Sequence, residues 1–477
     1  MKRRNFIQNA AFFGGLTMVD PFHLTAGSNF EIAKFPIVRT PKGKRNFESE
    51  TIENAINEFQ KNVKDEELGW LFNNCFPNTL DTTVNFTSKD GRPDTYVITG
   101  DIDSMWLRDS SAQVWPYLTF ANKDKNLKNL IAGVINRQNQ YLLKDPYANS
   151  FYEDPDKVGK WKSDLTEMKP GIHERKYEID SLCYPIRLGY NYWKITGDIQ
   201  PFDEKWQQAI HSILKVFKDQ QQKNGPGPYS FQRRTPNAKD TRSLDGYGYP
   251  VNPVGLICSA FRPSDDATVF SFLIPSNYFA VVSLQQASEM MDKIAGDSIT
   301  AIELKALSDE VKMALEEHAI VEHPDFGKIL AFEVDGFGNR LMMDDANVPS
   351  LLSLPYLDAI SETDALYQNT RKFVWSRSNP FFFKGTAAEG IGGPHVGMDM
   401  IWPMSIAMRG LTSTNKEEIK ECIQSLKSTH GNTGFMHESF NKDNPDDFSR
   451  SWFAWANTLF GELLWKTYKN YPEILNG

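Results

Sequence analysis

Two adjacent acids, Asp265 and Asp266, lie in the stretch FRPSDDATVF, just before the apolar run VFSFLIP. A carboxylate that leaves water without a partner is costly, so such acids need an arginine partner, a ligand or a role in proton transfer. Arg262, in the same stretch, is one available partner. If the two side chains lie together, each raises the pKa of the other, as a proton donor near neutral pH requires. The pair is therefore a candidate for an ion pair, for ligand binding or for proton transfer.

A second candidate stands near the C terminus, in GFMHESFNKDNPDDFSRSWFAWAN (434–457). His437 and Glu438 have apolar neighbours on each side, and Arg450 and Trp455 follow at the head of the last predicted helix. This composition is typical of a loop that forms the wall of a cleft and not of a solvent-exposed loop tip. Glu438 is therefore a candidate second carboxylate.

The stretch TGDIDSMWLRDSSAQVWPYL (99–118) gathers charges around one tryptophan. The residues of interest are Asp101, Asp103, Trp106, Arg108 and Asp109. Asp109 precedes a predicted helix and could serve only as its N-terminal cap. Capping does not account for all four charges, so this stretch also predicts part of a polar pocket.

Three more loops have the same character. They contain Glu178 and Asp180 in HERKYEIDSLCYP, Asp344 and Asp345 in NRLMMDDANVP, and Glu389 and His395 in GTAAEGIGGPHVG. The first two acids start an apolar helix, where the helix dipole alone favours acidic residues. The glycines before His395 form no phosphate-binding pattern.

Six loops that share acids, arginine and aromatic residues are what a polyhydroxylated ligand requires. Carboxylates accept hydroxyl protons, arginine and histidine donate, and tryptophan stacks on the apolar face of a sugar ring. Cleavage of a glycosidic bond further requires two carboxyl groups on opposite sides of that bond. The alternative is that these acids only pair with arginine inside the core.

Helical periodicity dominates the chain, with apolar residues at steps of three and four, and strand-like alternation is limited to TTVNFT, TYVIT and KILAFEVDG. We expect an all-α protein whose helices pair around a closed ring, because its long loops do not suit a short-loop bundle. The predicted helices are 51–63, 109–121, 127–143, 177–196, 204–221, 276–294, 301–319, 400–411, 416–429 and 451–468, with weaker candidates at 345–354 and 363–374.

The chain has 477 residues with 40% hydrophobic and 24% charged residues, and its net charge of −9 argues against a nucleic-acid partner. Residues 1–26 read as an export signal, either twin-arginine-like or of the Sec type, which predicts an exported, periplasmic protein. We expect a lead-in segment over 27–44 and one catalytic-sized domain over 45–477. No later apolar stretch is long enough to predict a membrane span.

The four cysteines, Cys75, Cys183, Cys258 and Cys422, are far apart and predict buried thiols. His318 and His323 are five residues apart, and the loop-like HPDF that begins at His323 argues against a metal site. We therefore expect neither a metal nor another cofactor.

The motifs RPSDD, GDIDSMWLRDS and GFMHESF, with RSWFAWAN behind the last, resemble glycoside hydrolase family 125, the bacterial and fungal exo-α-1,6-mannosidases. The resemblance runs from about residue 45 to 470. It implies an (α/α)6 barrel whose long loops and few short strands form the active-site face. It also implies inversion at the anomeric carbon, no metal, and removal of terminal non-reducing α-1,6-linked mannose from a mannose-containing oligosaccharide.

The resemblance further implies that the general acid is an Asp of RPSDD and that the general base is Glu438. Related helical-barrel glycosidases place the acid at the first Asp of a similar turn, which favours Asp265, and Asp266 would then orient it or bind a hydroxyl. Inversion predicts a gap of roughly 6.5 to 9.5 Å between acid and base. The expected substrate-binding residues are Asp101, Asp103, Trp106, Arg108, Asp109, Arg262, His395 and His437.

Two other functions fit the same kind of fold. A sugar epimerase or isomerase works through paired histidines or a metal, and the eight scattered histidines argue against it. A non-catalytic glycan-binding protein would keep the barrel without hydrolysis. The sequence leaves the natural glycan and the oligomeric state open.

Overall fold

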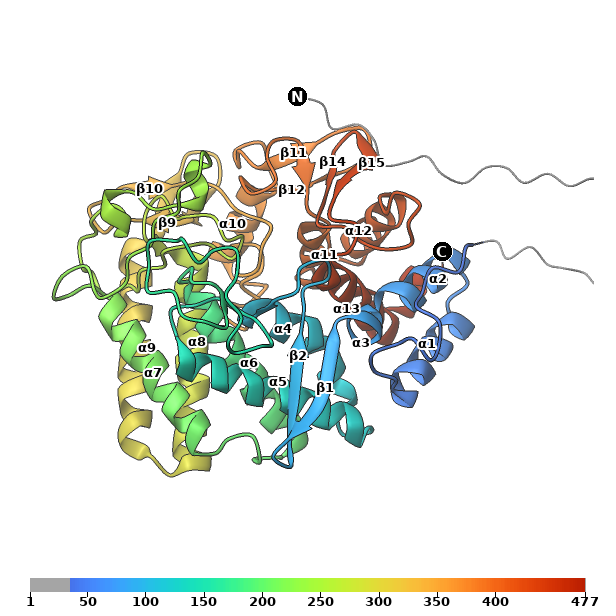
Figure 1. The fold of residues 1–477 in the computed structure, drawn as a ribbon. Helices are drawn as coiled ribbons and strands as arrows, with labels where there is room; N and C mark the ends of the chain where they lie inside the picture. Colours follow the sequence, from blue (N-terminus) through green and yellow to red (C-terminus); the bar gives the residue numbers. More distant parts are fainter. Residues whose placement is uncertain (1–34, 477) are drawn as a thin grey trace, which may run out of the picture. The chain divides into compact units, whose positions relative to one another are not determined.

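The computed structural model describes residues 35–476, so the predicted export signal at 1–26 lies outside the described residues. Residues Val38–Gly477 group as one compact unit. This unit is rich in helices, and its short strands form separate two- and three-stranded sheets in the described part of the chain (Figure 1).

One set of helices is buried on most sides and contacts one another in chain order. In this inner set α4 contacts α6, α6 contacts α8, α11 contacts α13, and α13 contacts α4. Every residue of α4 is buried. The set consists of α4 (Leu107–Val114), α6 (Ile179–Thr196), α8 (Ile274–Met290), α11 (Pro403–Leu411) and α13 (Ala454–Asn470).

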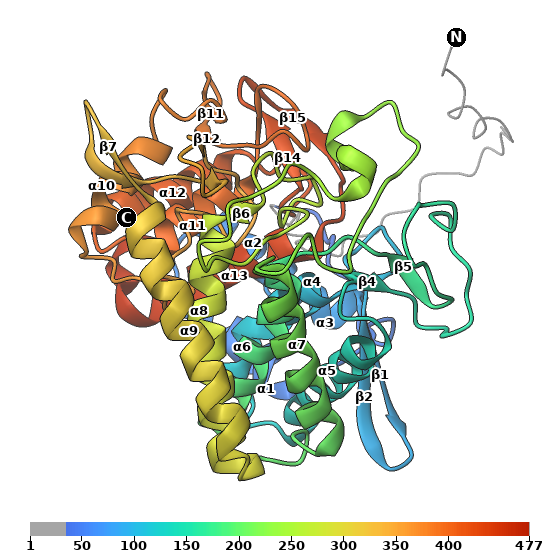
Figure 2. The ribbon, with the colours of Figure 1, turned by 90° about the vertical axis from the view of Figure 1, so that its left-hand side faces the viewer.

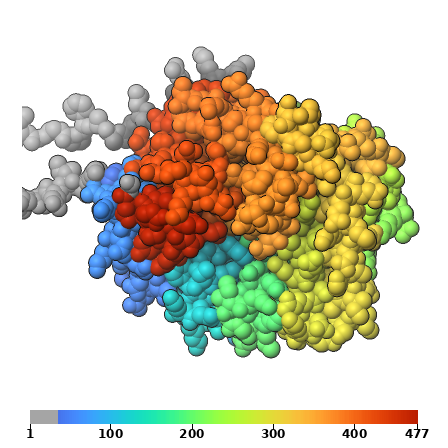
Figure 3. All heavy atoms as spheres, turned by 180° about the vertical axis from the view of Figure 1, so that it is seen from behind, coloured from blue at the N-terminus to red at the C-terminus, as the bar shows by residue number. Residues whose placement is uncertain are grey.

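The other long helices alternate with this inner set along the chain and pack outside it. Helix α5 packs on α6, α9 on α8, α12 on α11 and α2 on α13. Figure 2 shows α8 beside α9. Figure 3 shows the C-terminal segments, in red, beside the first helices, in blue. The outer helices are α1 (Glu50–Asn62), α2 (Glu66–Cys75), α5 (Lys125–Lys144), α7 (Glu204–Gln220), α9 (Ser298–His318), α10 (Ala365–Val374) and α12 (Lys416–Ser428).

The two sets differ in how their helices begin. Ser49, Asp124 and Asp203 cap outer helices by accepting backbone N–H bonds with their side chains. No inner helix has such a cap, and α4, α8 and α11 instead follow directly from the short strands β3, β6 and β13. The side chains at the starts of the inner helices are therefore not used for helix capping and can take part in a binding site.

Most short strands and long loops gather at one end of the helices, towards the top of Figures 1 and 2, whereas the hairpin of β1 and β2 (residues 84–97) extends towards the other end. Three-stranded antiparallel sheets at the first of these ends are β3–β4–β5, β10–β9–β6 and β13–β14–β15. Their strands are β3 (Met105–Trp106), β4 (Ser150–Phe151), β5 (Ile172–Glu174), β6 (Phe272–Leu273), β9 (Glu333–Val334), β10 (Arg340–Leu341), β13 (Met400–Ile401), β14 (Ser439–Asn441) and β15 (Asn444–Ser449).

The remaining elements are hairpins and short helical turns. The hairpins are β1 (Val84–Lys89) with β2 (Arg92–Val97), β7 (Ile320–His323) with β8 (Gly327–Leu330), and β11 (Phe382–Lys384) with β12 (Glu389–Ile391). The helical turns are α3 (Asn78–Thr82), η1 (Trp115–Phe120), η2 (Ala238–Asp240), η3 (Leu244–Gly246), the π-helical η4 (Met291–Ala295) and η5 (Pro472–Asn476).

The predicted helix 109–121 is two elements, because Pro116 lacks an N–H and α4 gives way to the 3-10 turn η1. The weaker candidate 345–354 is wrong, since this segment forms bends and turns. There the buried carboxylate of Asp344 accepts the N–H groups of Leu351 and Leu352, which replaces helical backbone pairing.

The four cysteines are buried and free, as predicted. Within residues 35–476, no helix combines the length and apolar character needed to cross a bilayer.

Candidate active site

The uncapped starts of α4, α11 and α13 meet the long loops, including the loop before α6, at one cavity of about 410 Å³. Four of the eight expected substrate-binding residues and all three candidate carboxylates line this cavity. Those that line the cavity are Trp106, Arg108, Asp109, Asp265, Asp266, His395 and Glu438. The cavity therefore unites segments up to some 330 residues apart in the chain.

Asp265 stands on a three-residue hairpin turn. The N–H of Asp265 donates to the carbonyl of Arg262 at 2.8 Å, and the N–H of Arg262 donates to the carbonyl of Asp266 at 2.8 Å. Pro263 presets the backbone at the first turn position, and Asp265 takes a left-handed conformation at φ 66°. This tight turn brings both acids to the cavity.

Several donors surround the side chain and carbonyl of Asp265. Its Oδ1 accepts from Arg108 Nη2 and from Asn149 Nδ2, each at 3.1 Å, and its carbonyl accepts from Lys176 Nζ at 2.8 Å. Burial alone would raise the pKa of Asp265, but the charges of Arg108 and Lys176 and a hydrogen bond with Glu178 lower it below the ordinary value.

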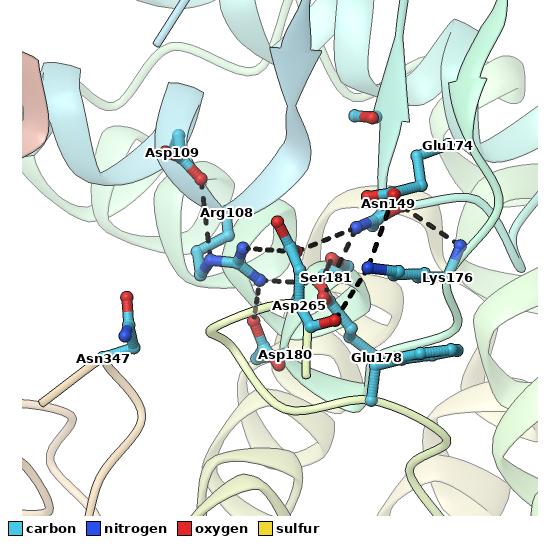
Figure 4. Close-up of polar contacts among 12 residues, drawn as sticks. Arg108, Asp109, Asn149, Glu174, Lys176, Glu178, Asp180, Ser181, Asp265 and Asn347 are labelled. Carbon is cyan, nitrogen blue, oxygen red and sulfur yellow. Dashed lines mark hydrogen bonds and ion pairs between the residues drawn. The ribbon is translucent and has the colours of Figure 1, made fainter. Parts of the chain in front are cut away.

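Arg108 is the centre of a buried cluster of acids, drawn in Figure 4. Its Nη1 donates to Glu178 at 2.6 Å and to Asp180 at 3.1 Å, and both carboxyl side chains have no exposed surface. Burial raises the pKa of Glu178 well above its usual range, although Arg108 opposes this, and burial raises the pKa of Asp180 to about 6.

Asp109 is the second acid of this cluster that lines the cavity. It lies 3.5 Å from Arg108 and is 5% exposed. Burial raises the pKa of Asp109 to about 6, with the charge of Arg108 working against burial and the charge of Asp265 adding to it. Asp109 therefore changes charge within the range in which many hydrolases work.

Asp266 has a different partner. Its Oδ1 lies 3.0 Å from Nδ1 of His395, while its buried Oδ2 has no partner. Lys239 reaches across the mouth of this turn and donates to the carbonyls of Pro394 and His395. Burial alone would lower the pKa of His395, but the hydrogen bond to Asp266 and the charges of Asp266 and Glu438 raise it.

Glu438 is held by the hairpin that follows it. Strands β14 and β15 pair Ser439 with Ser449, which returns the chain to Glu438. Its Oε2 accepts from Ser449 Oγ at 2.8 Å, and its Oε1 accepts from Arg450 Nη1 at 3.2 Å. Arg450 is itself anchored on Asp101 at 2.9 Å. The carboxylate is thus fixed in orientation within the cavity.

Aromatic rings complete the walls. Trp402, Phe453 and Trp455 stand at the starts of α11 and α13, and Trp161 lines the cavity from the loop between β4 and β5. The guanidinium of Arg233 lies 3.5 Å over the ring of Trp161. Such rings offer flat surfaces for stacking against a sugar.

Four expected substrate-binding residues do not line the cavity. Asp103 is exposed and pairs with Lys157, and Asp101 acts through Arg450. The other two are buried supports: Arg262 donates to Glu333 at 2.6 Å, and His437 stacks on Phe448 with ring centres 3.7 Å apart. Glu389 also lies elsewhere, in contact with Lys384 and Arg409.

Sequence reasoning missed several polar residues of the cavity and its surroundings. Asn149, Lys176, Lys239, Asn347 and Arg233 either line the cavity or bind a residue that does. Each is a single polar residue in a loop without a recognisable motif, so no local signal marks it.

No group of three or more His, Cys, Asp or Glu among the described residues has the arrangement of a metal site.

Comparison with known proteins identifies the family of this chain. The family model described as "Metal-independent alpha-mannosidase (GH125)" matches residues 65–465. The Meiotically up-regulated gene 157 protein of Schizosaccharomyces pombe is 40% identical over 460 residues, which cover 93% of this chain and 90% of the relative.

A solved structure from Streptococcus pneumoniae is 42% identical, with a TM-score of 0.86, and the match covers 89% of this chain and all of that one. It is described as a metal-independent alpha mannosidase in a non-productive substrate complex with α-1,6-mannobiose. This chain belongs to glycoside hydrolase family 125, the metal-independent α-mannosidases.

Proposed function

We propose that this protein is an inverting exo-α-1,6-mannosidase that removes terminal mannose from oligosaccharides, with Asp265 as the general acid and Glu438 as the general base. The observation that carries the proposal is that Asp265 and Glu438, 173 positions apart in sequence, line one cavity. The α-1,6-mannobiose bound by the S. pneumoniae relative supports the substrate class.

Glu438 suits the role of base because its position is fixed from two sides. Ser449 and Arg450 each donate to one of its oxygens, so the carboxylate cannot turn away from the cavity. A base in an inverting enzyme activates a water on the far face of the sugar, and hydrogen bonds that hold the carboxylate keep that water in line. We expect room for one water between Glu438 and the anomeric carbon.

Asp265 suits the role of acid better than its neighbour. Its side chain is 22% exposed, against 4% for Asp266, so it is the more accessible of the two. Asp266 is committed to His395, whose raised pKa favours an ion pair. Asp265 instead shares the donor Asn149 with a second carboxyl, that of Glu178, whose pKa burial raises, so one proton can be held beside Asp265. Asp266 would then hold His395 in place.

The mannose would be bound by the buried end of the cavity. Arg108 and Asp109 offer a donor and an acceptor to neighbouring hydroxyls, and Trp402 and Trp455 offer stacking faces. A binding site of this kind accepts the terminal mannose of a glycan chain and not an internal mannose, which is the basis for exo action. We further propose that the alternating inner and outer helices close into an (α/α)6 barrel, with the turns after Asp345 in place of one inner helix.

The test is hydrolysis of α-1,6-mannobiose, compared with the α-1,2 and α-1,3 isomers. We expect mannose release from the α-1,6 isomer by the wild type and a loss of about 10²-fold or more in Asp265→Ala and in Glu438→Ala, with disaccharide binding retained. Binding without hydrolysis by the wild type would point instead to a glycan-binding protein. Interconversion of free sugars would point to an epimerase.

We also propose that residues 1–26 direct export and are removed, which would place the mature protein in the periplasm. The basic start, the short apolar stretch and the small residues that follow support this. The first residue of the mature protein, determined by N-terminal sequencing after expression from the full gene, tests it. An intact N terminus on cytoplasmic protein would contradict it.

A further inference from the structure

We propose that Glu178 is a positioning residue that shares one proton with Asp265 and delivers it to the catalytic acid. The inference rests on the proposed function, because it concerns how Asp265 obtains the proton that it gives to the glycosidic oxygen. Glu178 itself does not line the cavity, so it acts only through Asp265.

The first observation is that Glu178 and Asp265 share the same donors. Asn149 Nδ2 lies 3.3 Å from Oε1 of Glu178 and 3.1 Å from Oδ1 of Asp265, and Arg108 donates to Glu178 through Nη1 and to Asp265 through Nη2. Two carboxyl groups that are held this close and largely out of water do not both ionise easily. The geometry of the pair therefore favours one shared proton.

The second observation is the charge balance around this pair. Glu178 is approached by Arg108 at 2.6 Å, Ser181 at 2.7 Å and Asn149 at 3.3 Å. Arg108 also faces Asp180, Asp109 and Asp265, so a single guanidinium serves four carboxyl groups. Four ionised acids around one buried cation would leave uncompensated charge, which burial strongly disfavours.

The other cation that contacts the pair, Lys176, does not change this balance. Its Nζ binds the backbone carbonyl of Asp265, and its charge is shared with Asp240 at 2.5 Å and Glu174 at 3.4 Å. Among the acids of the cluster, Glu178 and Asp180 have no exposed surface, and it is Glu178 that shares the donor Asn149 with Asp265. Glu178 is therefore where the proton rests before substrate binds.

One proton passes through the pair in each cycle. The O–H bond of Glu178 breaks as an O–H bond forms on Asp265, and Asp265 then gives this proton to the glycosidic oxygen while the bond from that oxygen to the anomeric carbon breaks. Glu438 takes a proton from the attacking water. When the products leave, Glu438 returns its proton to solvent, and Asp265 takes a proton from solvent and passes it back to Glu178, so the cycle balances.

The test is the pH profile of Glu178→Gln on α-1,6-mannobiose. The amide keeps the shape of Glu178 and still donates to Asp265, but it cannot transfer a proton. Asp265 must then hold the proton alone beside Arg108, so the alkaline limb of kcat/KM moves to lower pH by about one to three units. An alkaline limb identical to that of the wild type overturns the inference.

A second substrate separates this failure from failure of the proposed function. Fluoride leaves α-mannosyl fluoride without a proton donor, so Glu178→Gln is expected to hydrolyse it at the wild-type rate. Equal losses on both substrates would mean that Glu178 only supports the fold, and the inference would fall. Full mannobiose activity in Asp265→Asn would instead overturn Asp265 as the acid. Asp180→Asn is the matched control, since Asp180 is equally buried on Arg108 but does not share Asn149 with Asp265. The alkaline limb of this variant is expected to move less.

Infrared spectroscopy gives a readout that does not depend on activity. At neutral pH the wild type is expected to show the C=O band of a buried carboxylic acid that titrates together with the alkaline limb of kcat/KM. The band of Asp344, whose pKa burial raises to about 8, is removed by recording both proteins on an Asp344→Asn background. If Glu178→Gln folds, the band is lost from its spectrum. A wild-type band that does not follow the alkaline limb overturns the inference even if Glu178→Gln does not fold.

Discussion

Glu438 and Arg450 stand at the two ends of one β hairpin and are joined by a hydrogen bond of 3.2 Å between Oε1 and Nη1. Because Arg450 is also anchored on Asp101, the loop before α4 fixes the orientation of a carboxylate more than 330 positions later in the chain. This contact explains why two distant motifs of the sequence share one composition of acid and arginine.

Replacement of Arg450 by alanine is expected to lower kcat by about 10- to 100-fold, because Glu438 loses the donor that aims it at the water. KM for α-1,6-mannobiose is expected to change less, since Arg450 acts mainly through Glu438. Steady-state kinetics measure both. The exposed Arg377 provides the matched control, and Arg377→Ala should behave as the wild type. A rise in KM with unchanged kcat would show that Arg450 binds sugar instead.

The His395–Asp266 pair predicts a pH dependence of stability. The folded-state pKa of His395 is raised, so its ion pair contributes fully below the unfolded-state pKa and is lost as the pH rises through the folded-state value. The difference in Tm between wild type and His395→Gln is therefore expected to shrink as the pH rises above that value. A difference that is constant across this range would contradict the pairing.

Asp109 predicts a pH dependence of sugar binding. Its pKa is raised to about 6, so the ionised form that accepts two hydroxyl protons is gained as the pH rises through 6. Mannose affinity, measured by calorimetry between pH 5 and about 7.5, is expected to increase in the wild type. In Asp109→Asn the mannose affinity should be lower and should not change over this pH range. The same increase in affinity in both proteins would exclude Asp109 as the titrating group.

Trp161 predicts a contact with the leaving group. Its ring lines the cavity and is held by the guanidinium of Arg233 at 3.5 Å. We expect Trp161→Ala to raise KM for α-1,6-mannobiose by up to about tenfold, as the loss of one stacking face implies. Hydrolysis of α-mannosyl fluoride, which has no leaving sugar, should be unchanged. Equal effects on both substrates would place Trp161 at the mannose instead.

The helical part of the fold could be predicted from amphipathic periodicity. Outer helices such as α1 bury one stripe of residues, Ile52, Ala55, Ile56 and Phe59, which is the pattern that a sequence window detects. Helix α2 escaped prediction, because Leu68, Gly69, Leu71, Phe72, Asn74 and Cys75 are buried on several sides and leave no single stripe. The failure at 345–354 has another cause, since the tertiary contact of Asp344 with two backbone N–H groups is invisible in a local pattern.

The residues of the site also divide into those that a local sequence pattern predicts and those that depend on tertiary contacts. That Asp265, Asp266 and Glu438 line the cavity could be predicted, because two acids before an apolar run, or an acid between apolar residues, break the usual pattern of the chain. Arg262 and His437 share that surprising composition but serve as buried supports, and sequence cannot separate the two cases because both need polar groups in an apolar setting. The cluster of Glu178 with Arg108 depends on a contact across 70 positions.

The most direct test of the account is the anomeric form of the first mannose released from α-1,6-mannobiose, followed by proton NMR in wild type and in Glu438→Ala with added azide. If Asp265 and Glu438 act on opposite faces of one sugar ring, the wild type releases β-mannose first, and azide restores turnover of the variant by forming β-mannosyl azide. Release of α-mannose by the wild type, or unimpaired release of mannose by Glu438→Ala without azide, would contradict it.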